Sequence, residues 1–321
     1  MRILLVRLSA LGDVVTGLHV LATLRVRQPE AYVGWLVEDR FAGLLEGHPQ
    51  LDALHVYPRR SGVLRGGLRL TLSLRRHRYE TALDLQGNLK SGVLARLSGA
   101  RRVVGLDGRH SREGNRLFVR DRVAAGPGHR NDAYWTLLDA VIGPGPRLLA
   151  TLPAAAPPHG RIVFHPGVSR WLPFKRWPAS SFAALGDRLA TRLGTEVLVS
   201  SGPADREEAN AVVGAMRTPA RLADEPGLPA LVRLLAGARL VVAADTGPAH
   251  LAAASGVPTV VLFGPTDPAV AAPLGPRVRS LRAGVRCSPC ELRSCPDTVC
   301  MSGISVDAVE SAALELLGGT S

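Results

Sequence analysis

The stretch LVVAADTGPAHLAAASGVPTVVLF, residues 240–263, decides the fold class. It contains an apolar run at 240–244, a polar turn, a helix-length run of small residues at 248–254 and a second apolar run at 259–263. Two apolar runs joined through a helix are typical of parallel strands that are buried on both faces. The stretch therefore predicts an α/β protein with a parallel sheet.

The same alternation continues outward from this stretch. In the second half, the pattern predicts further strands at 161–164 and 196–200 and helices at 179–192, 205–216, 228–236 and 306–317. In the first half, it predicts strands at 3–6, 32–37, 53–56, 81–85 and 102–104 and a helix at 14–26. Residues 143–160 are rich in Pro, Gly and Ala, which is typical of a linker. We expect two Rossmann-like domains, 1–150 and 151–321, with ligands at the carboxyl ends of the strands.

Length and composition exclude several classes of protein. The chain has 321 residues, of which 46% are hydrophobic, so it can form two cores and is neither a disordered tail nor a disulfide-stapled miniprotein. No segment resembles a signal peptide, and no apolar run approaches the roughly 20 residues of a membrane span. We expect a soluble, cytoplasmic protein.

The net charge of +12 is divided unevenly along the chain. Residues 1–150 carry a net +10 and residues 151–321 only +2. Such a charge suits nucleic acid, an anionic membrane surface or anionic substrates. Nucleic-acid binding ranks far behind, because only Tyr57, Tyr79 and Phe118 lie among the basic stretches as stacking residues. All basic residues except Lys90 and Lys175 are arginines, which codon bias explains. Because lysine and arginine are not interchangeable at an anion site, both lysine positions are candidates for anion contacts.

Asp13 follows the first predicted strand in the turn Leu11-Gly12-Asp13. The residues alone leave two roles open. Asp13 could be the N-cap of the next helix, since aspartate accepts hydrogen bonds from free helical N–H groups, or it could be a functional carboxylate. The turn lacks the Gly-x-Gly-x-x-Gly pattern, which disfavours dinucleotide binding at this strand.

Two turns in the second half have the chemistry of an anion site. His165-Pro166-Gly167 follows a strand and is succeeded by Lys175-Arg176-Trp177-Pro178, which offers backbone N–H groups and one cation to a phosphate. The alternative is an ordinary loop in which Trp177 is a packing anchor and Pro178 starts a helix. Asp245-Thr246-Gly247 comes directly before a helix, and Gly264-Pro265-Thr266-Asp267 follows the next strand at the same predicted edge. His250, taken alone, is better explained as a core histidine.

These segments, together with Asp84-Leu85-Gln86-Gly87-Asn88-Leu89-Lys90-Ser91, resemble in their order glycosyltransferase family 9, the ADP-heptose:lipopolysaccharide heptosyltransferases. The resemblance covers nearly the whole chain. It implies the GT-B fold, in which two Rossmann-like domains face each other across a cleft. The N-terminal domain would bind the acceptor and the C-terminal domain the nucleotide sugar.

The resemblance also implies roles for individual residues. Asp13 matches the general base that deprotonates the acceptor hydroxyl, and Lys175 matches the lysine that contacts the diphosphate leaving group. The nucleotide-sugar-binding residues would be Gly167, Lys175, Glu207, Asp245, Thr246, Gly247 and His250. The alignment around Glu207, the candidate for the ribose contact, is ambiguous.

On the acceptor side, the resemblance points to five basic residues: Arg59, Arg60, Lys90, Arg112 and His129. Their counterparts contact the phosphates and carboxylates of a lipid-linked core sugar. The Arg- and Leu-rich segment 59–78 is explained either as a solvated basic helix or loop, or as a segment that rests on anionic lipid.

All four cysteines fall in one segment: Cys287, Cys290, Cys295 and Cys300. The spacing would allow a structural four-thiolate zinc site, which a reducing cytoplasm favours over disulfides. Four free thiols in a surface loop are the alternative. A catalytic metal is not expected, because Lys175 and a helix terminus can serve the leaving group.

The resemblance implies an inverting, metal-independent transfer of heptose from ADP-heptose to the Kdo or heptose of the lipopolysaccharide inner core. The expected partners are the donor, an anionic lipid A-Kdo type acceptor and the cytoplasmic face of the inner membrane. One alternative keeps the fold but uses another nucleotide sugar. A non-catalytic sugar-nucleotide binder is disfavoured by the presence of Asp13.

Overall fold

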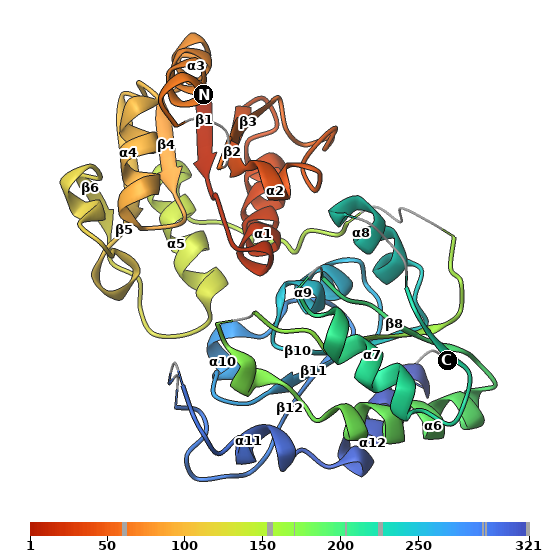
Figure 1. The fold of residues 1–321 in the computed structure, drawn as a ribbon. Coiled ribbons are helices and arrows are strands. Elements are labelled where there is room, and N and C mark those ends of the chain that lie inside the picture. Colours follow the sequence, from red (N-terminus) through yellow and green to blue (C-terminus); the bar gives the residue numbers. More distant parts are fainter. Residues whose placement is uncertain are drawn as a thin grey trace. The chain divides into compact units, whose positions relative to one another are not determined.

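The computed structural model describes residues 1–59, 63–152, 157–169, 171–202, 204–223, 227–290, 292 and 294–318. The chain divides into two compact units, Met1–Ala150 and Thr151–Ser321. Each unit contains a parallel sheet with helices packed on both faces (Figure 1). We describe each unit by itself.

Unit 1 begins with a strand, a long helix and a second strand, and then continues the alternation. Its elements are β1 (Arg2–Val6), α1 (Leu11–Arg27), β2 (Tyr32–Glu38), α2 (Asp39–Ala42), β3 (Ala53–Tyr57), α3 (Val63–Arg76), β4 (Thr81–Asp84), α4 (Leu89–Leu97), β5 (Arg102–Leu106), η1 (Gly108–His110), η2 (Asn115–Leu117), β6 (Asp121–Val123) and α5 (Arg130–Ile142).

The strands of unit 1 are parallel and lie in the order β3-β2-β1-β4-β5-β6. This is the Rossmann order, in which the chain changes direction between the first and fourth strands. The register pairs Val6 of β1 with Asp84 of β4, so both strands end at the same level. A ligand of such a sheet binds outside the carboxyl ends of these two strands.

Unit 2 repeats the plan. Its elements are β7 (Ile162–His165), η3 (Pro173–Lys175), α6 (Ala179–Leu193), β8 (Val197–Val199), α7 (Arg206–Ala215), β9 (Ala220–Leu222), α8 (Leu228–Ala236), β10 (Leu240–Ala244), α9 (Gly247–Ala254), β11 (Thr259–Phe263), α10 (Pro268–Ala271), β12 (Val278–Arg282), α11 (Val299–Ser302) and α12 (Val306–Gly318). The parallel order β12-β11-β10-β7-β8-β9 places the equivalent change of direction between β7 and β10.

The apolar runs became the buried centre of each sheet. Every residue of β10 and β11 is buried, and so is every residue of β4 and β7. Three strands that the pattern did not indicate are β6, β9 and β12, and all three lie at sheet edges and are mostly exposed or half-buried. An edge strand buries little apolar surface, so its sequence carries little of the signal that marks a buried strand.

Side chains on both faces of the sheets form the cores. In unit 1, one face packs Leu4, Val6 and Leu36 against Leu70 and Leu74 of α3. In unit 2, Trp177 is 2% exposed, lies among the residues of the core and donates its indole N–H to the carbonyl of Ile304 over 3.0 Å. Among the described residues, no helix is both long and apolar enough to span a bilayer.

Candidate active site

The carboxylate of Asp13 lies at the start of α1, directly after β1. The N-cap of this helix is Ala10, and Asp13 occupies the third helical position, where its Oδ2 accepts the Ala10 N–H over 3.2 Å. The prediction that Asp13 could be the N-cap of this helix is therefore wrong, because Asp13 lies three residues after the N-cap. Asp13 instead supplies the reciprocal bond of a capping box, which holds its side chain against the turn.

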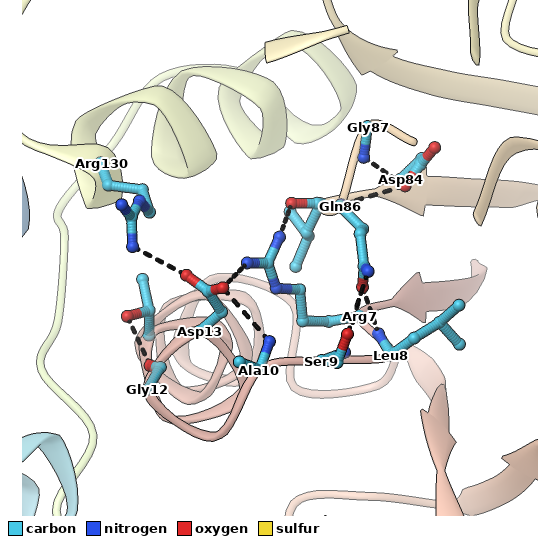
Figure 2. A network of polar contacts seen from close by, with 12 residues as sticks. Arg7, Leu8, Ser9, Ala10, Gly12, Asp13, Asp84, Gln86, Gly87 and Arg130 are labelled. Carbon is cyan, nitrogen blue, oxygen red and sulfur yellow. Dashed lines mark hydrogen bonds and ion pairs between the residues drawn. The ribbon is translucent and has the colours of Figure 1, made fainter. Parts of the chain in front are cut away.

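Two arginines flank this carboxylate (Figure 2). Nη2 of Arg7 lies 2.5 Å from Oδ2 of Asp13, and Nη1 of Arg130, on the first residue of α5, lies 2.8 Å from Oδ1. The Arg7 side chain is only 5% exposed, whereas Asp13 is 22% exposed. Asp13 therefore neutralises a buried guanidinium and still reaches solvent, where a substrate hydroxyl could approach it.

The loop after β4 supports the segment that leads to Asp13. Oε1 of Gln86 accepts the N–H groups of Leu8 and Ser9 over 2.8 and 3.1 Å, and the Arg7 guanidinium donates to the carbonyl of Leu85 (Figure 2). The chain ends of β1 and β4 are thus joined by hydrogen bonds at the point where the strand order reverses. This arrangement positions Asp13 relative to the loop 84–91.

Asp84 fixes the shape of that loop from inside the protein. Its Oδ1 accepts the N–H groups of Gln86 and Gly87, and its Oδ2 accepts from Ser91 and Asn115. Burial raises the pKa of this carboxyl, while the four hydrogen bonds act in the opposite direction. Gly87 has φ +72°, and a Cβ there would lie 1.9 Å from the carbonyl oxygen of His110, so only glycine fits.

The predicted acceptor residues lie around this edge of unit 1, but their contacts differ. Nζ of Lys90 lies 2.9 Å from Oε1 of the buried Glu38. Arg59 donates its backbone N–H to Asp39, and Arg112 donates its backbone N–H to Gly87 with its side chain exposed. His129 is the N-cap of α5 and accepts the N–H of Asn131, a structural role that the sequence did not indicate. Arg60 lies outside the described residues.

Arg130 is a basic residue of this site that the sequence analysis missed. It contacts Asp13 across 117 positions of sequence. Burial lowers the pKa of His110, and the charges of Arg109, Arg130 and Arg112 lower it further, so each of these arginines acts on the same histidine. Only the linear closeness of Arg130 to the predicted His129 could have suggested it.

In unit 2, Lys175 and Asp245 meet where the strand order reverses. Nζ of Lys175, at the end of η3, lies 2.6 Å from Oδ2 of Asp245, directly after β10. Both side chains are largely buried, with 15% and 11% exposed. The lysine therefore has a carboxylate partner 70 positions away. The pair combines a mobile cation with a hydrogen-bond acceptor beside the start of α9, where backbone N–H groups favour an anion.

The other residues of the predicted donor turn follow on α9. Thr246 is its N-cap, Gly247 its first residue, and the half-buried His250 lies on its first turn. The hydroxyl of Thr246 donates to the carbonyl of Ala244. Residues 245–250 therefore form one continuous strand-to-helix turn at the edge that also carries Lys175.

The turn after β8 holds an acidic residue other than the predicted one. Glu207 is exposed on α7, while Asp205 lies so close to Gly167 that a Cβ on that glycine would be 2.8 Å from the Cβ of Asp205. Burial raises the pKa of Asp205, the charge of Glu208 raises it further, and its Oδ1 has no hydrogen-bond partner among the described residues. Oδ1 of the half-buried Asp205 is thus a buried acceptor beside the β7 turn. Its N-cap position concealed it, because aspartate is common there.

The four cysteines are free thiols in this structure. Cys287 is exposed, Cys290 and Cys295 are half-buried, and Cys300 is buried on α11. Burial raises the pKa of Cys300, and the other three thiols raise it further. Across the described ranges, no three His, Cys, Asp or Glu side chains are arranged to hold a metal ion. Structural zinc therefore stays a prediction from spacing.

Two solved heptosyltransferase structures share this arrangement. An Escherichia coli ADP-heptose lipopolysaccharide heptosyltransferase II shares 24% identity and a TM-score of 0.80, covering 99% of this chain and 98% of the other. The E. coli heptosyltransferase WaaC with ADP-2-deoxy-2-fluoro heptose shares 25% identity and a TM-score of 0.78, covering 98% of this chain and 99% of the other. The fold of this chain is that of the GT-B glycosyltransferases.

The sequence places the chain within that class. The model of glycosyltransferase family 9 (heptosyltransferase) matches residues 68–141 and 146–299. Lipopolysaccharide heptosyltransferase 1 of Pseudomonas aeruginosa is 33% identical over 313 residues, covering 92% of this chain and 87% of the relative. The chain belongs to glycosyltransferase family 9, and the resemblance read from its motifs is confirmed.

Proposed function

We propose that this protein transfers heptose from ADP-heptose to the inner core of lipopolysaccharide. The family and the relatives named lipopolysaccharide heptosyltransferase support this reaction. The observation that carries it is the carboxylate of Asp13, which two arginines hold at the carboxyl ends of β1 and β4 with part of its surface exposed. A non-catalytic binder of sugar nucleotides has no need of such a carboxylate.

In the proposed reaction, Asp13 removes the proton of the acceptor hydroxyl. The acceptor oxygen forms a bond to the anomeric carbon as the bond from that carbon to the diphosphate oxygen breaks, which inverts the configuration. ADP leaves with the electron pair. Arg7 keeps the Asp13 side chain in place, and Gln86 holds the preceding backbone, so that the carboxylate meets the hydroxyl without reorganisation.

Lys175 and the start of α9 would stabilise the negative charge that develops on the diphosphate. In the structure Lys175 is paired with Asp245. We propose that Lys175 turns towards the diphosphate when the donor binds, while Asp245 accepts a donor hydroxyl. These groups make a catalytic metal unnecessary, and we expect full activity in the presence of a chelator.

The nucleoside end of the donor has two acidic candidates on the turn after β8. Asp205 has a buried oxygen without a partner, and such an atom costs free energy until a donor group satisfies it. Glu207, which the family resemblance suggested, is exposed. We propose that Asp205 accepts a hydroxyl of the nucleotide, with Glu207 at the outer margin of the same site.

On the acceptor side, we propose that an anionic, lipid-linked inner-core sugar binds at the carboxyl edge of the unit 1 sheet. Arg130 supplies positive charge beside Asp13, Lys90 and Arg112 supply it on the loops of the same edge, and Arg59 and Arg60 extend it along the chain. A lipid-linked acceptor also requires the enzyme to work at a membrane surface, which we propose is the cytoplasmic face of the inner membrane.

A donor panel tests the proposal. The purified protein is incubated with a Kdo-bearing acceptor and ADP-heptose, ADP-glucose or UDP-sugars, and nucleoside diphosphate release is followed with and without EDTA. We expect release from ADP-heptose only, unchanged by EDTA. Transfer from a UDP-sugar but not from ADP-heptose would contradict the assigned donor, and loss of activity in EDTA would contradict the metal-independent mechanism.

A further inference from the structure

Helix α3 presents leucines to solvent on one side and to the core on the other. Leu70 and Leu74 are 7% and 0% exposed and belong to the core of unit 1. Leu68 and Leu72 are 63% and 50% exposed and lie one helical turn apart, so their side chains form a single row on the outer face. The core requires only the inner pair. The outer pair places apolar surface in water without a role in the fold.

The outer leucines lie among arginines. Residues 53–79 contain seven arginines and no aspartate or glutamate. Of these, Arg69, Arg75 and Arg76 lie on α3 with exposed side chains, at helical positions that surround Leu68 and Leu72. This part of the chain accounts for most of the net +10 carried by residues 1–150.

A pocket of about 310 Å³ lies between α3 and β3, the edge strand of the sheet. Its wall is mostly apolar, with Arg69 as its cation, and the lining residues are Leu54, His55, Val56, Pro58, Arg69, Leu70 and Ser73. Val56 is itself 38% exposed. The apolar surface of α3 therefore continues into a hollow that has a positive charge in its wall.

The patch continues to the neighbouring helix. α3 packs beside α4, and Nε of Arg75 donates to the carbonyl of Leu97 over 3.2 Å (Figure 1). Leu97 is 39% exposed, and Arg96 beside it is exposed as well. The outer surfaces of α3 and of the end of α4 thus share one composition, leucine among arginine, across two elements that are separate in sequence.

We infer that this surface, which we call the α3 face and define by Leu68, Leu72, Leu97, Arg69, Arg75 and Arg76, docks unit 1 on an anionic phospholipid bilayer. Leucines reach the acyl region while the guanidinium groups remain with the lipid phosphates. A protein partner without negative charge would leave the arginines uncompensated, whereas an anionic bilayer satisfies both the charge and the apolar surface.

The inference rests on the proposed function and adds to it the element that meets the membrane. α3 follows β3 and starts after its carboxyl end, and β3 is parallel to β1 and β4. The helix therefore begins on the edge of the sheet where Asp13 and the loop 84–91 lie. Arg75, Arg76 and Leu97 end the helices that lead into β4 and β5, so the α3 face lies towards the opposite edge of the sheet. Docking through it would hold unit 1 at the membrane that carries the acceptor and leave the acceptor edge uncovered.

Vesicle co-sedimentation with the full-length protein tests the α3 face, without donor or acceptor present. We expect the parent to bind vesicles that contain phosphatidylglycerol, to bind pure phosphatidylcholine weakly, and to dissociate at high salt. The double variant Arg69→Gln, Arg76→Gln should bind about 30-fold more weakly, since each basic residue near an anionic surface contributes roughly 1 kcal/mol. Leu68→Ser, Leu72→Ser should reduce binding at least about tenfold.

Two control variants make the comparison specific. Leu149→Ser replaces a leucine with 45% exposure outside the α3 face, and Arg192→Gln, Arg279→Gln removes two charges from exposed arginines of unit 2. Both should bind vesicles within about twofold of the parent. Circular dichroism verifies that every variant is folded, and ADP release with a delipidated acceptor should match the parent.

Three outcomes would overturn the inference: no binding of the parent to anionic vesicles, equal binding to neutral vesicles, or α3-face variants that bind like the controls. Because the vesicle assay contains no substrate, it remains informative even if the donor assignment is wrong. Conversely, a failure of the parent in the donor panel would count against the proposed function alone.

Discussion

Replacing Asp13 with asparagine distinguishes the contribution of the proposed base to turnover from its contribution to stability. The change keeps the shape of the side chain but removes its charge. In the parent, Arg130 lies 2.8 Å from Oδ1. In the variant, the amide oxygen can still accept from Arg7, whereas the amide nitrogen points its hydrogens at Arg130. The variant therefore cannot take a proton from the acceptor hydroxyl, while the donor residues of unit 2 are untouched.

The structure sets the size of both effects. A positioned general base contributes roughly 10²–10⁴-fold to the rate, which is about 3–5 kcal/mol in the activation barrier. Removing the charge also leaves Arg7, 5% exposed, without its ionic partner. Breaking a buried pair costs about 3–5 kcal/mol, and because Asp13 is 22% exposed we expect about 3 kcal/mol, or a fall of roughly 6–12 °C in Tm.

Three measurements check this prediction: ADP release with acceptor for kcat, calorimetric titration with ADP-heptose for donor affinity, and thermal unfolding for stability. Donor affinity should stay within about twofold of the parent. The control is Asp132→Asn, which removes the charge of an exposed aspartate paired with Arg147 over 3.0 Å. It should lose less than about 1 kcal/mol and keep its activity. An Asp13→Asn enzyme with activity near the parent, or with donor binding lost in proportion to turnover, would refute the assignment.

Three further predictions follow from contacts in the two units. Lys175→Ala removes a charged hydrogen-bond donor and should weaken ADP-heptose binding about 10- to 150-fold in calorimetric titrations; unchanged affinity would exclude a diphosphate contact. Gly87→Ala places a Cβ 1.9 Å from the carbonyl oxygen of His110, so its Tm should fall and its acceptor KM should rise, and a normal KM would mean that the loop shape does not matter for the acceptor. Burial lowers the pKa of His165 from 6.5 to about 4, so protonation favours the unfolded chain. The free energy of unfolding should therefore fall as the pH drops from about 6.5 to 4, by up to about 3 kcal/mol, and His165→Asn should abolish this part of the loss in thermal melts across that range.

The sequence was sufficient for the parts of the fold that are buried. The runs at 240–244 and 259–263 coincide with β10 and β11, because strands covered on both faces must be apolar throughout. The motif at 175–178 contains residues that stabilise the fold and a residue of the site, and only the structure separates the two. Trp177 packs in the core and Pro178 is the N-cap of α6, whereas Lys175 belongs to the site.

The partners of the site residues could not be predicted. Arg130 and Asp13 are 117 positions apart, and Lys175 and Asp245 are 70 apart. A pattern along the chain records which residues follow a strand, but not which of the distant residues reach them. Asp205 is the clearest case, since the sequence shows neither that it lies against Gly167 nor that its Oδ1 is buried without a partner among the described residues.

By itself, the sequence determined the two α/β units, the family and the turns that carry Asp13, Lys175 and Asp245, because local hydrophobic periodicity and short motifs are written in consecutive residues. Only the tertiary structure decided the electrostatic surroundings of those turns. The strand order brings β7 beside β10, which pairs Lys175 with Asp245, and the packing of α5 against α1 brings Arg130 to Asp13. Charge interactions depend on distance in space, which strand order sets and residue spacing does not.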